Sequence, residues 1–154
     1  MTSIGIRTLC LLILLMAAPV GLARVYPLDD SQTQVLGSSV PMQWQHFFPK
    51  RGQPDYLVGQ IQVRLHLNVA RWQGQQAKIY QLLPNYSSGP FYVEWRGQGR
   101  VMDGAMHDGE RVLVYQGLIQ QPSLEDTLLL QITADGGRLS RNQPLQFKFE
   151  IEPE

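Results

Sequence analysis

Cysteine is almost absent from this 154-residue chain, which contains only Cys10, near its N-terminus. We expect Cys10 to be removed with an export signal, so the mature chain would have no thiol. This excludes disulfides, thiolate catalysis and zinc or iron–sulfur sites held by cysteine. The fold must then be stabilised by packing alone, which about 130 residues can supply.

The chain also lacks an excess of charge of either sign. Its 13 Lys and Arg residues balance its 13 Asp and Glu residues, and only 17% of all residues are charged. A protein that binds nucleic acid through its phosphates needs a positive surface, so we expect no nucleic-acid partner. With 44% hydrophobic residues, the chain has the composition of a globular domain.

Motifs for catalysis, metals and cofactors are missing as well. The sequence has no Gly-x-Ser-x-Gly element and no Asp-x-Asp-x-Asp calcium loop. The three histidines, His46, His66 and His107, are not spaced as metal ligands. We therefore predict no catalytic, metal-binding or cofactor-binding residues, and a protein that is not an enzyme.

Residues 1–23 show the three parts of an export signal. Arg7 supplies the positive charge, residues 9–20 form an apolar run, and residues 21–23 include small residues where a signal peptidase cuts. We expect cleavage after Ala23. The apolar run has 12 residues, whereas a membrane-spanning helix needs about 20. The sequence thus predicts a periplasmic or extracellular protein, bacterial because it lacks disulfides, with no membrane span after signal removal.

The mature chain divides into an irregular lead-in and a regular body. Residues 24–59 are rich in Pro and Gly, and only residues 40–48 are apolar and aromatic enough for a short strand. Residues 60–154 show the patterning of strands and turns, and we expect them to form the body of a β-sandwich.

Alternation of apolar and polar residues predicts half-buried strands in the body, because successive side chains of a strand point to opposite faces. The clearest run covers residues 61–69, where Ile61, Val63 and Leu65 alternate with polar residues. The other strands that we expect cover residues 77–83, 91–96, 111–116, 128–133 and 145–151.

Turns rich in Gly, Asp and Pro separate these runs, and the pair Asp108 and Gly109 is typical of a hairpin turn. No mature segment of about 11 residues has helical periodicity. The pattern predicts an all-β domain, an immunoglobulin-like antiparallel β-sandwich of about seven strands, with a small β-barrel as the alternative.

Aromatic residues supply the candidate binding surface. Trp95 shares a strand face with other apolar residues, so we expect it in the core. Trp72 follows a strand in a turn rich in Gly and Gln, and we expect it to be exposed, together with Tyr86, Tyr92 and Arg96. Such a surface can stack on sugars or seat a protein. Alternatively, Trp72 folds back onto the edge of the sandwich.

These features favour a non-catalytic structural or assembly role in the cell envelope through contact with another protein. Pilus or fimbria assembly is an example, because sheet edges pair there with neighbouring chains. The alternative is a module that binds glycan or peptidoglycan through the four residues named above. A small hydrolase is a third hypothesis, which would need a histidine beside a serine or carboxylate in a cleft. The expected partner is thus an envelope protein or a glycan.

Overall fold

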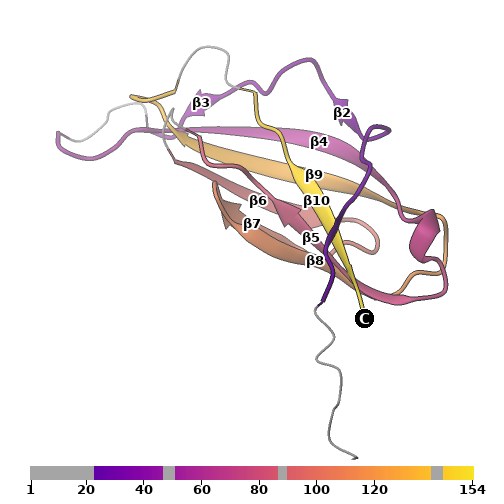
Figure 1. Ribbon diagram of the computed structural model, residues 1–154. Helices are drawn as coiled ribbons and strands as arrows, with labels where there is room; N and C mark the ends of the chain where they lie inside the picture. Colours follow the sequence, from indigo (N-terminus) through magenta and orange to yellow (C-terminus); the bar gives the residue numbers. More distant parts are fainter. Residues whose placement is uncertain (1–22, 47–50, 87–89, 140–143) are drawn as a thin grey trace, which may run out of the picture.

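Antiparallel strand pairing organises the chain into two sheets that pack face to face (Figure 1). The computed structural model describes residues 23–46, 51–86, 90–139 and 144–154. Apart from Ala23, the predicted export signal lies outside the described residues. Within those ranges, no helix has both the length and the apolar character that a membrane span requires.

Ten strands and one helical turn are present in the described ranges. The turn is the 3-10 helix η1 (Ala70–Trp72). The strands are β1 (Tyr26–Pro27), β2 (Gln34–Leu36), β3 (Gln43–Trp44), β4 (Tyr56–Asn68), β5 (Gln76–Leu82), β6 (Phe91–Gly97), β7 (Gly104–His107), β8 (Arg111–Leu118), β9 (Ser123–Asp135) and β10 (Lys148–Pro153).

The predicted β-sandwich is confirmed. One sheet has four strands in the order β1-β10-β5-β8, and the other has six, in the order β2-β4-β9-β6-β7 with β3 also paired to β4. The two sheets stay separate, so the small-barrel alternative does not apply. In Figure 1, β10 crosses in front of β4 and β9. Ten strands are described against the expected seven or so, because β1, β2 and β7 were not predicted.

The lead-in, residues 24–59, contains more strand than we expected. It forms β1, β2 and β3, of which only β3 falls within the predicted strand at residues 40–48, and β4 already begins at Tyr56. Each short strand completes the edge of a sheet by backbone pairing, β1 along β10 and the other two along β4. Backbone pairing at an edge makes little demand on side-chain alternation, which is why the pattern did not reveal these strands.

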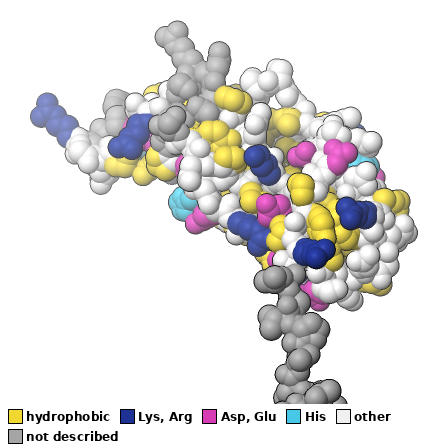
Figure 2. All heavy atoms as spheres, viewed as in Figure 1, with side chains coloured by type: hydrophobic (Ala, Val, Ile, Leu, Met, Phe, Trp, Pro, Cys, Tyr) yellow, Lys and Arg dark blue, Asp and Glu magenta, His cyan; other side chains and the backbone are white. Residues whose placement is uncertain are grey.

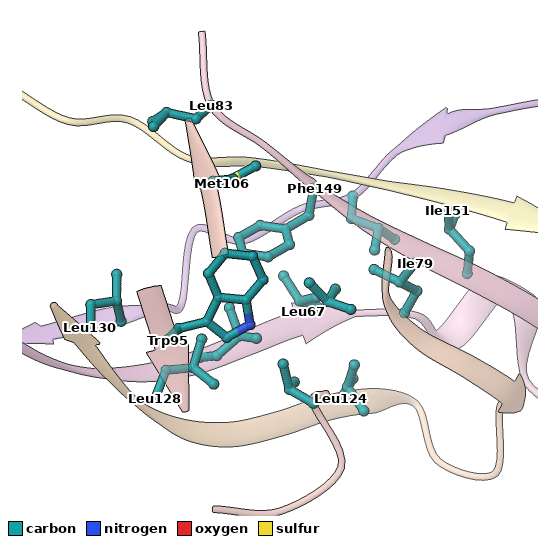
Figure 3. Close-up of a cluster of buried hydrophobic side chains, with 14 of the residues drawn as sticks. Leu67, Ile79, Leu83, Trp95, Met106, Leu124, Leu128, Leu130, Phe149 and Ile151 are labelled. Carbon is teal, nitrogen blue, oxygen red and sulfur yellow. The ribbon is translucent and has the colours of Figure 1, made fainter. Parts of the chain in front are cut away.

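The inward side chains of both sheets form one core (Figure 3). Trp95 on β6 is 1% exposed, which confirms its predicted burial. Its indole N–H donates a hydrogen bond of 2.9 Å to the Met102 carbonyl. Gly104 on β7 lies directly against the indole ring and leaves no room for a side chain. Leu67 and Ile79, one from each sheet, are fully buried in the same cluster.

Candidate functional site: a groove between the sheet edges

Trp72, the centre of the expected binding surface, is buried. It is only 8% exposed, so of the two alternatives left open by the sequence, exposure is wrong and the folding of Trp72 back onto the sandwich applies. The η1 turn folds its ring back onto the N-terminal segment, where the ring centroid lies 5.8 Å from that of Tyr26. The guanidinium carbon of Arg71 also lies 5.8 Å from the Trp72 ring. Trp72 therefore stabilises the contact between β1 and the body of the sandwich.

Tyr86 also has a structural contact that the sequence did not predict. Its ring packs edge-on against Phe91, with 5.4 Å between the centroids. Its hydroxyl accepts a hydrogen bond of 2.8 Å from the backbone N–H of Gln146. Tyr86 thus ties the segment that precedes β10 to the first residue of β6, and its ring is half-buried rather than free for a sugar.

Tyr92 and Arg96 share the outer face of β6, and they are the only two of the four predicted residues that lie on one face. The Tyr92 ring lies 4.8 Å from that of His107, and its hydroxyl donates to Glu94 at 3.2 Å. Desolvation, followed by the negative charge of Glu94, raises the pKa of Tyr92 above its usual value. The arrangement provides no joint aromatic platform.

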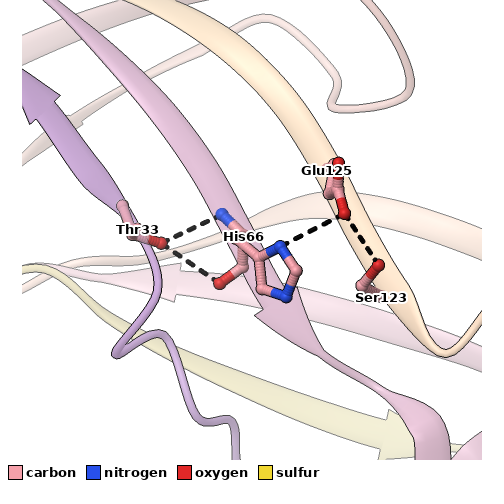
Figure 4. Close-up of polar contacts among 4 residues, drawn as sticks. All are labelled: Thr33, His66, Ser123 and Glu125. Atoms are coloured by element: carbon pink, nitrogen blue, oxygen red, sulfur yellow. Dashed lines mark hydrogen bonds and ion pairs between the residues drawn. The ribbon is translucent and has the colours of Figure 1, made fainter.

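His66 has both a carboxylate and a serine nearby, on the outer face of β4 and β9 (Figure 4). Its Nδ1 lies 3.2 Å from Oε1 of Glu125, and Ser123 Oγ donates to the same oxygen at 3.0 Å. Glu125 therefore separates the hydroxyl from the imidazole, whereas a nucleophilic serine needs direct contact with its base. The Glu125 side chain is 65% exposed, so this group is open to solvent.

Thr33, in the segment that leads into β2, holds the backbone of His66 through two hydrogen bonds. The Thr33 hydroxyl accepts a hydrogen bond from the His66 N–H at 3.0 Å and donates one to the His66 carbonyl at 3.2 Å. These contacts continue the pairing of β2 with β4, so the role of this part of β4 is structural. Among the residues that the structure describes, no three His, Cys, Asp or Glu side chains are grouped as a metal site.

A large apolar cavity opens elsewhere, between β2 of one sheet and β10 of the other, and we call it the interlayer groove. Its volume is about 980 Å³. Figure 2, seen from the side where β10 crosses in front of β4 and β9, shows apolar side chains at the surface among polar ones. The lining residues that matter most for its chemistry are Val35, Val63, Gln81, Leu145, Phe147 and Phe149.

One row of paired residues shows how the groove arises. Val35 on β2 pairs with Val63 on β4, which pairs with Leu128 on β9, so all three side chains lie on the inner face. Leu128 is 2% exposed, Val63 is half-buried and Val35 is 56% exposed. The six-stranded sheet therefore extends beyond the cover that the four-stranded sheet provides.

The opposite wall of the groove is an incompletely paired strand edge. β1 pairs with β10 over two residues only, and the last backbone bond runs from the Leu28 N–H to the Phe149 carbonyl at 2.9 Å. Among the described residues, Leu145 and Phe147 make no backbone hydrogen bond, although both side chains pack partly against the core. Both residues line the groove, so this wall includes a stretch of backbone without a paired strand.

Gln81 on β5 is the polar exception in this wall. It pairs in register with Phe149 and is only 1% exposed. Its Oε1 is buried and accepts no hydrogen bond from the described residues. The preceding inward residues of β5, Ala77 and Ile79, are apolar. The Gln81 side chain therefore offers a buried acceptor to whatever occupies the groove.

Gln81→Met should stabilise the isolated protein. Methionine keeps the unbranched shape of glutamine but removes the buried, unpartnered oxygen, whose desolvation costs about 1–3 kcal/mol. We expect the free energy of unfolding in urea to rise by about 1 kcal/mol. The matched control is Gln62→Met on the outer face of β4, which should leave stability unchanged. A loss of stability in Gln81→Met would show that the amide is satisfied in solution.

Sequence reasoning missed the groove for an identifiable reason. The run of residues 77–83 looks irregular because Gln81 stands where the period requires an apolar residue. If Ala77, Ile79 and Leu83 are assigned to the inner face, Gln81 must be a polar residue in the core. A buried polar residue needs a partner, so this is the feature of the sequence that could have indicated the groove. No feature of the sequence indicates that the four-stranded sheet leaves Val35 uncovered, because the extent of this covering depends on how the two sheets pack.

In comparisons with known proteins, no family model, no curated protein and no solved structure matches the chain.

Proposed function

We propose that this chain is a non-catalytic structural or assembly protein of the bacterial cell envelope, which acts by binding another protein in the interlayer groove, as in the assembly of pilus-type surface structures. The observation that carries the proposal is the 56% exposure of Val35, an apolar side chain on the inner face of its sheet. Val35 belongs to the apolar lining of the interlayer groove, together with Val63 and Phe147, and a contiguous accessible apolar surface of this kind marks a contact surface. Export rests on the signal-like sequence of residues 1–23.

The chemistry of the groove supports binding rather than catalysis. Its lining is mainly aliphatic and aromatic, and its charged side chains are Asp30 and Lys148, one of each sign. The burial of Trp72 and the separation of the other predicted residues count against the glycan-binding alternative.

Photo-cross-linking in the source cells tests the proposal. A photoreactive amino acid at Val35 would face the groove, whereas one at the adjacent Leu36 would face outward from the same strand, and both positions are exposed, at 56% and 43%. We expect a discrete cross-linked protein from Val35 only, identified by mass spectrometry and lost when the gene for that protein is deleted. Equal products from both positions, or none from Val35, would refute a role for the groove in assembly.

A further inference from the structure

We propose that the interlayer groove receives an extended segment of a partner polypeptide, which adds a strand along the open edge beside β10. This inference rests on the proposed function and specifies the form of the bound partner. Alternate apolar side chains of the segment would pack against Val35, Val63 and Phe147, and its backbone would pair with the unpaired groups of residues 145 and 147.

Part of the open edge of β10 is already paired with a strand of this chain. β1 lies against its C-terminal half as an antiparallel strand, at Ile151 and Glu150, and the pairing stops after the bond from Leu28 to Phe149. The groove begins where this pairing ends, so a bound segment would continue a ladder that the chain itself starts. Addition of a strand to an open edge is a common way to bind an extended peptide.

Gln81 favours the same occupant. Its buried Oε1 needs a donor, and a polypeptide segment can supply an N–H or a side-chain hydroxyl. A hydrocarbon chain has no donor, and a helix has already used its inner backbone N–H groups. Neither of them would satisfy both Gln81 and the unpaired backbone at Leu145 and Phe147.

A partner protein fits better than a second copy of this chain. The described segments of this chain that have alternating apolar residues, in β4, β6, β9 and β10, are all paired within its own sheets. The groove also has no excess of charge, because Asp30 and Lys148 offset each other. We therefore infer a segment with apolar residues at alternate positions, no strong charge on that face, and a Ser, Thr, Asn or Gln opposite Gln81.

Selection from a displayed library of random peptides tests this inference on the purified, exported chain. Peptides of about 12 residues are long enough to form one strand. We expect the enriched peptides to share alternating apolar residues with a polar donor at one fixed position. In the complex, hydrogen exchange at the amides of Leu145 and Phe147 should slow.

Variants locate the bound peptide. Val35→Asp should weaken binding about tenfold or more, because it brings a charge into an apolar contact. Gln81→Met should weaken binding about fivefold, the equivalent of one hydrogen bond. Leu36→Asp, on the opposite face of β2, should bind as the unmodified chain does. Val35 and Leu36 are both exposed, so both aspartate variants should fold, which circular dichroism will verify.

Several results would overturn the inference. They are enrichment of peptides with helical periodicity, the absence of any enriched peptide, equal binding to Val35→Asp, or self-association of the chain through the groove. Failure of the proposed function would give a different result from failure of this inference. Peptides would then bind as strands, but the photoreactive residue at Val35 would capture no protein in cells. Capture at Val35 without strand-like peptides would retain the assembly role and reject the added strand.

Discussion

Leu65→Asp is expected to leave the chain unfolded. Leu65 lies in the middle of the inner face of β4 and is 1% exposed, so an aspartate there would bury a charge among apolar side chains. It would also stand directly opposite Asp126 of β9, which is itself buried. Together these effects should exceed about 4 kcal/mol, a large share of the stability of a typical domain. Circular dichroism and proteolysis of the purified variant will measure the outcome.

The control for Leu65→Asp is Gln62→Asp, which introduces the same side chain on the exposed face of the same strand. It should fold normally. The sequence alone also predicts an equal effect for Phe147→Asp, but Phe147 is only half-buried and precedes β10, so a smaller loss is expected. Normal folding of Leu65→Asp would contradict the assignment of faces on β4, and with it the orientation of Val63 in the groove.

Asp126→Ala is expected to lower the free energy of unfolding by about 3 kcal/mol or more. The carboxylate of Asp126 is 8% exposed and accepts hydrogen bonds from the backbone N–H groups of Gln98 at 3.1 Å, Val101 at 2.7 Å and Thr127 at 2.7 Å. Alanine would remove a carboxylate acceptor from all three donors at once, although the Gln98 N–H would keep its second bond, to the Thr127 carbonyl at 3.1 Å. Urea unfolding measures the loss, and faster amide exchange at Val101 would locate it in the loop between β6 and β7.

Two related variants sharpen this test. Glu125→Ala, one residue away on the outer face of β9, removes only the contacts of an exposed side chain with His66 and Ser123 and should change stability by less than about 1 kcal/mol. Asp126→Asn retains one acceptor oxygen and should lie between the other two. If Asp126→Ala and Glu125→Ala have equal effects, the carboxylate does not organise the loop.

Local patterning was sufficient to predict most of the fold. The alternation at residues 61–69 lies in β4, the pattern at residues 91–96 corresponds to β6, and the turn at Asp108 and Gly109 follows β7, with Gly109 at a φ of +84°. These features depend on near neighbours in the chain, because a strand with one buried face needs a period of two and such a turn needs a residue that accepts positive φ.

Features set by tertiary packing were not predictable in the same way. The polar neighbours of Trp72 in the sequence left both its exposure and its burial open, because its burial depends on contact with the distant Tyr26. The final strand begins at Lys148 rather than Leu145, because the preceding residues have no strand beside them to pair with. The groove is likewise a property of two sheets of unequal extent. The sequence therefore indicates which residues face inward, but not which of them remain uncovered.

The pairing of the first strand with the last has a consequence for the timing of folding. β1 pairs with β10, and the long ladder of β4 and β9 joins Tyr56 to Asp135, so both sheets depend on contacts between distant parts of the chain. Such topologies fold slowly, over milliseconds to seconds, because distant segments must meet before either sheet is complete. The four-stranded sheet cannot close until the ribosome has made residues 148–153. During synthesis the four-stranded sheet therefore remains incomplete while the residues of β5 and β8 are already available.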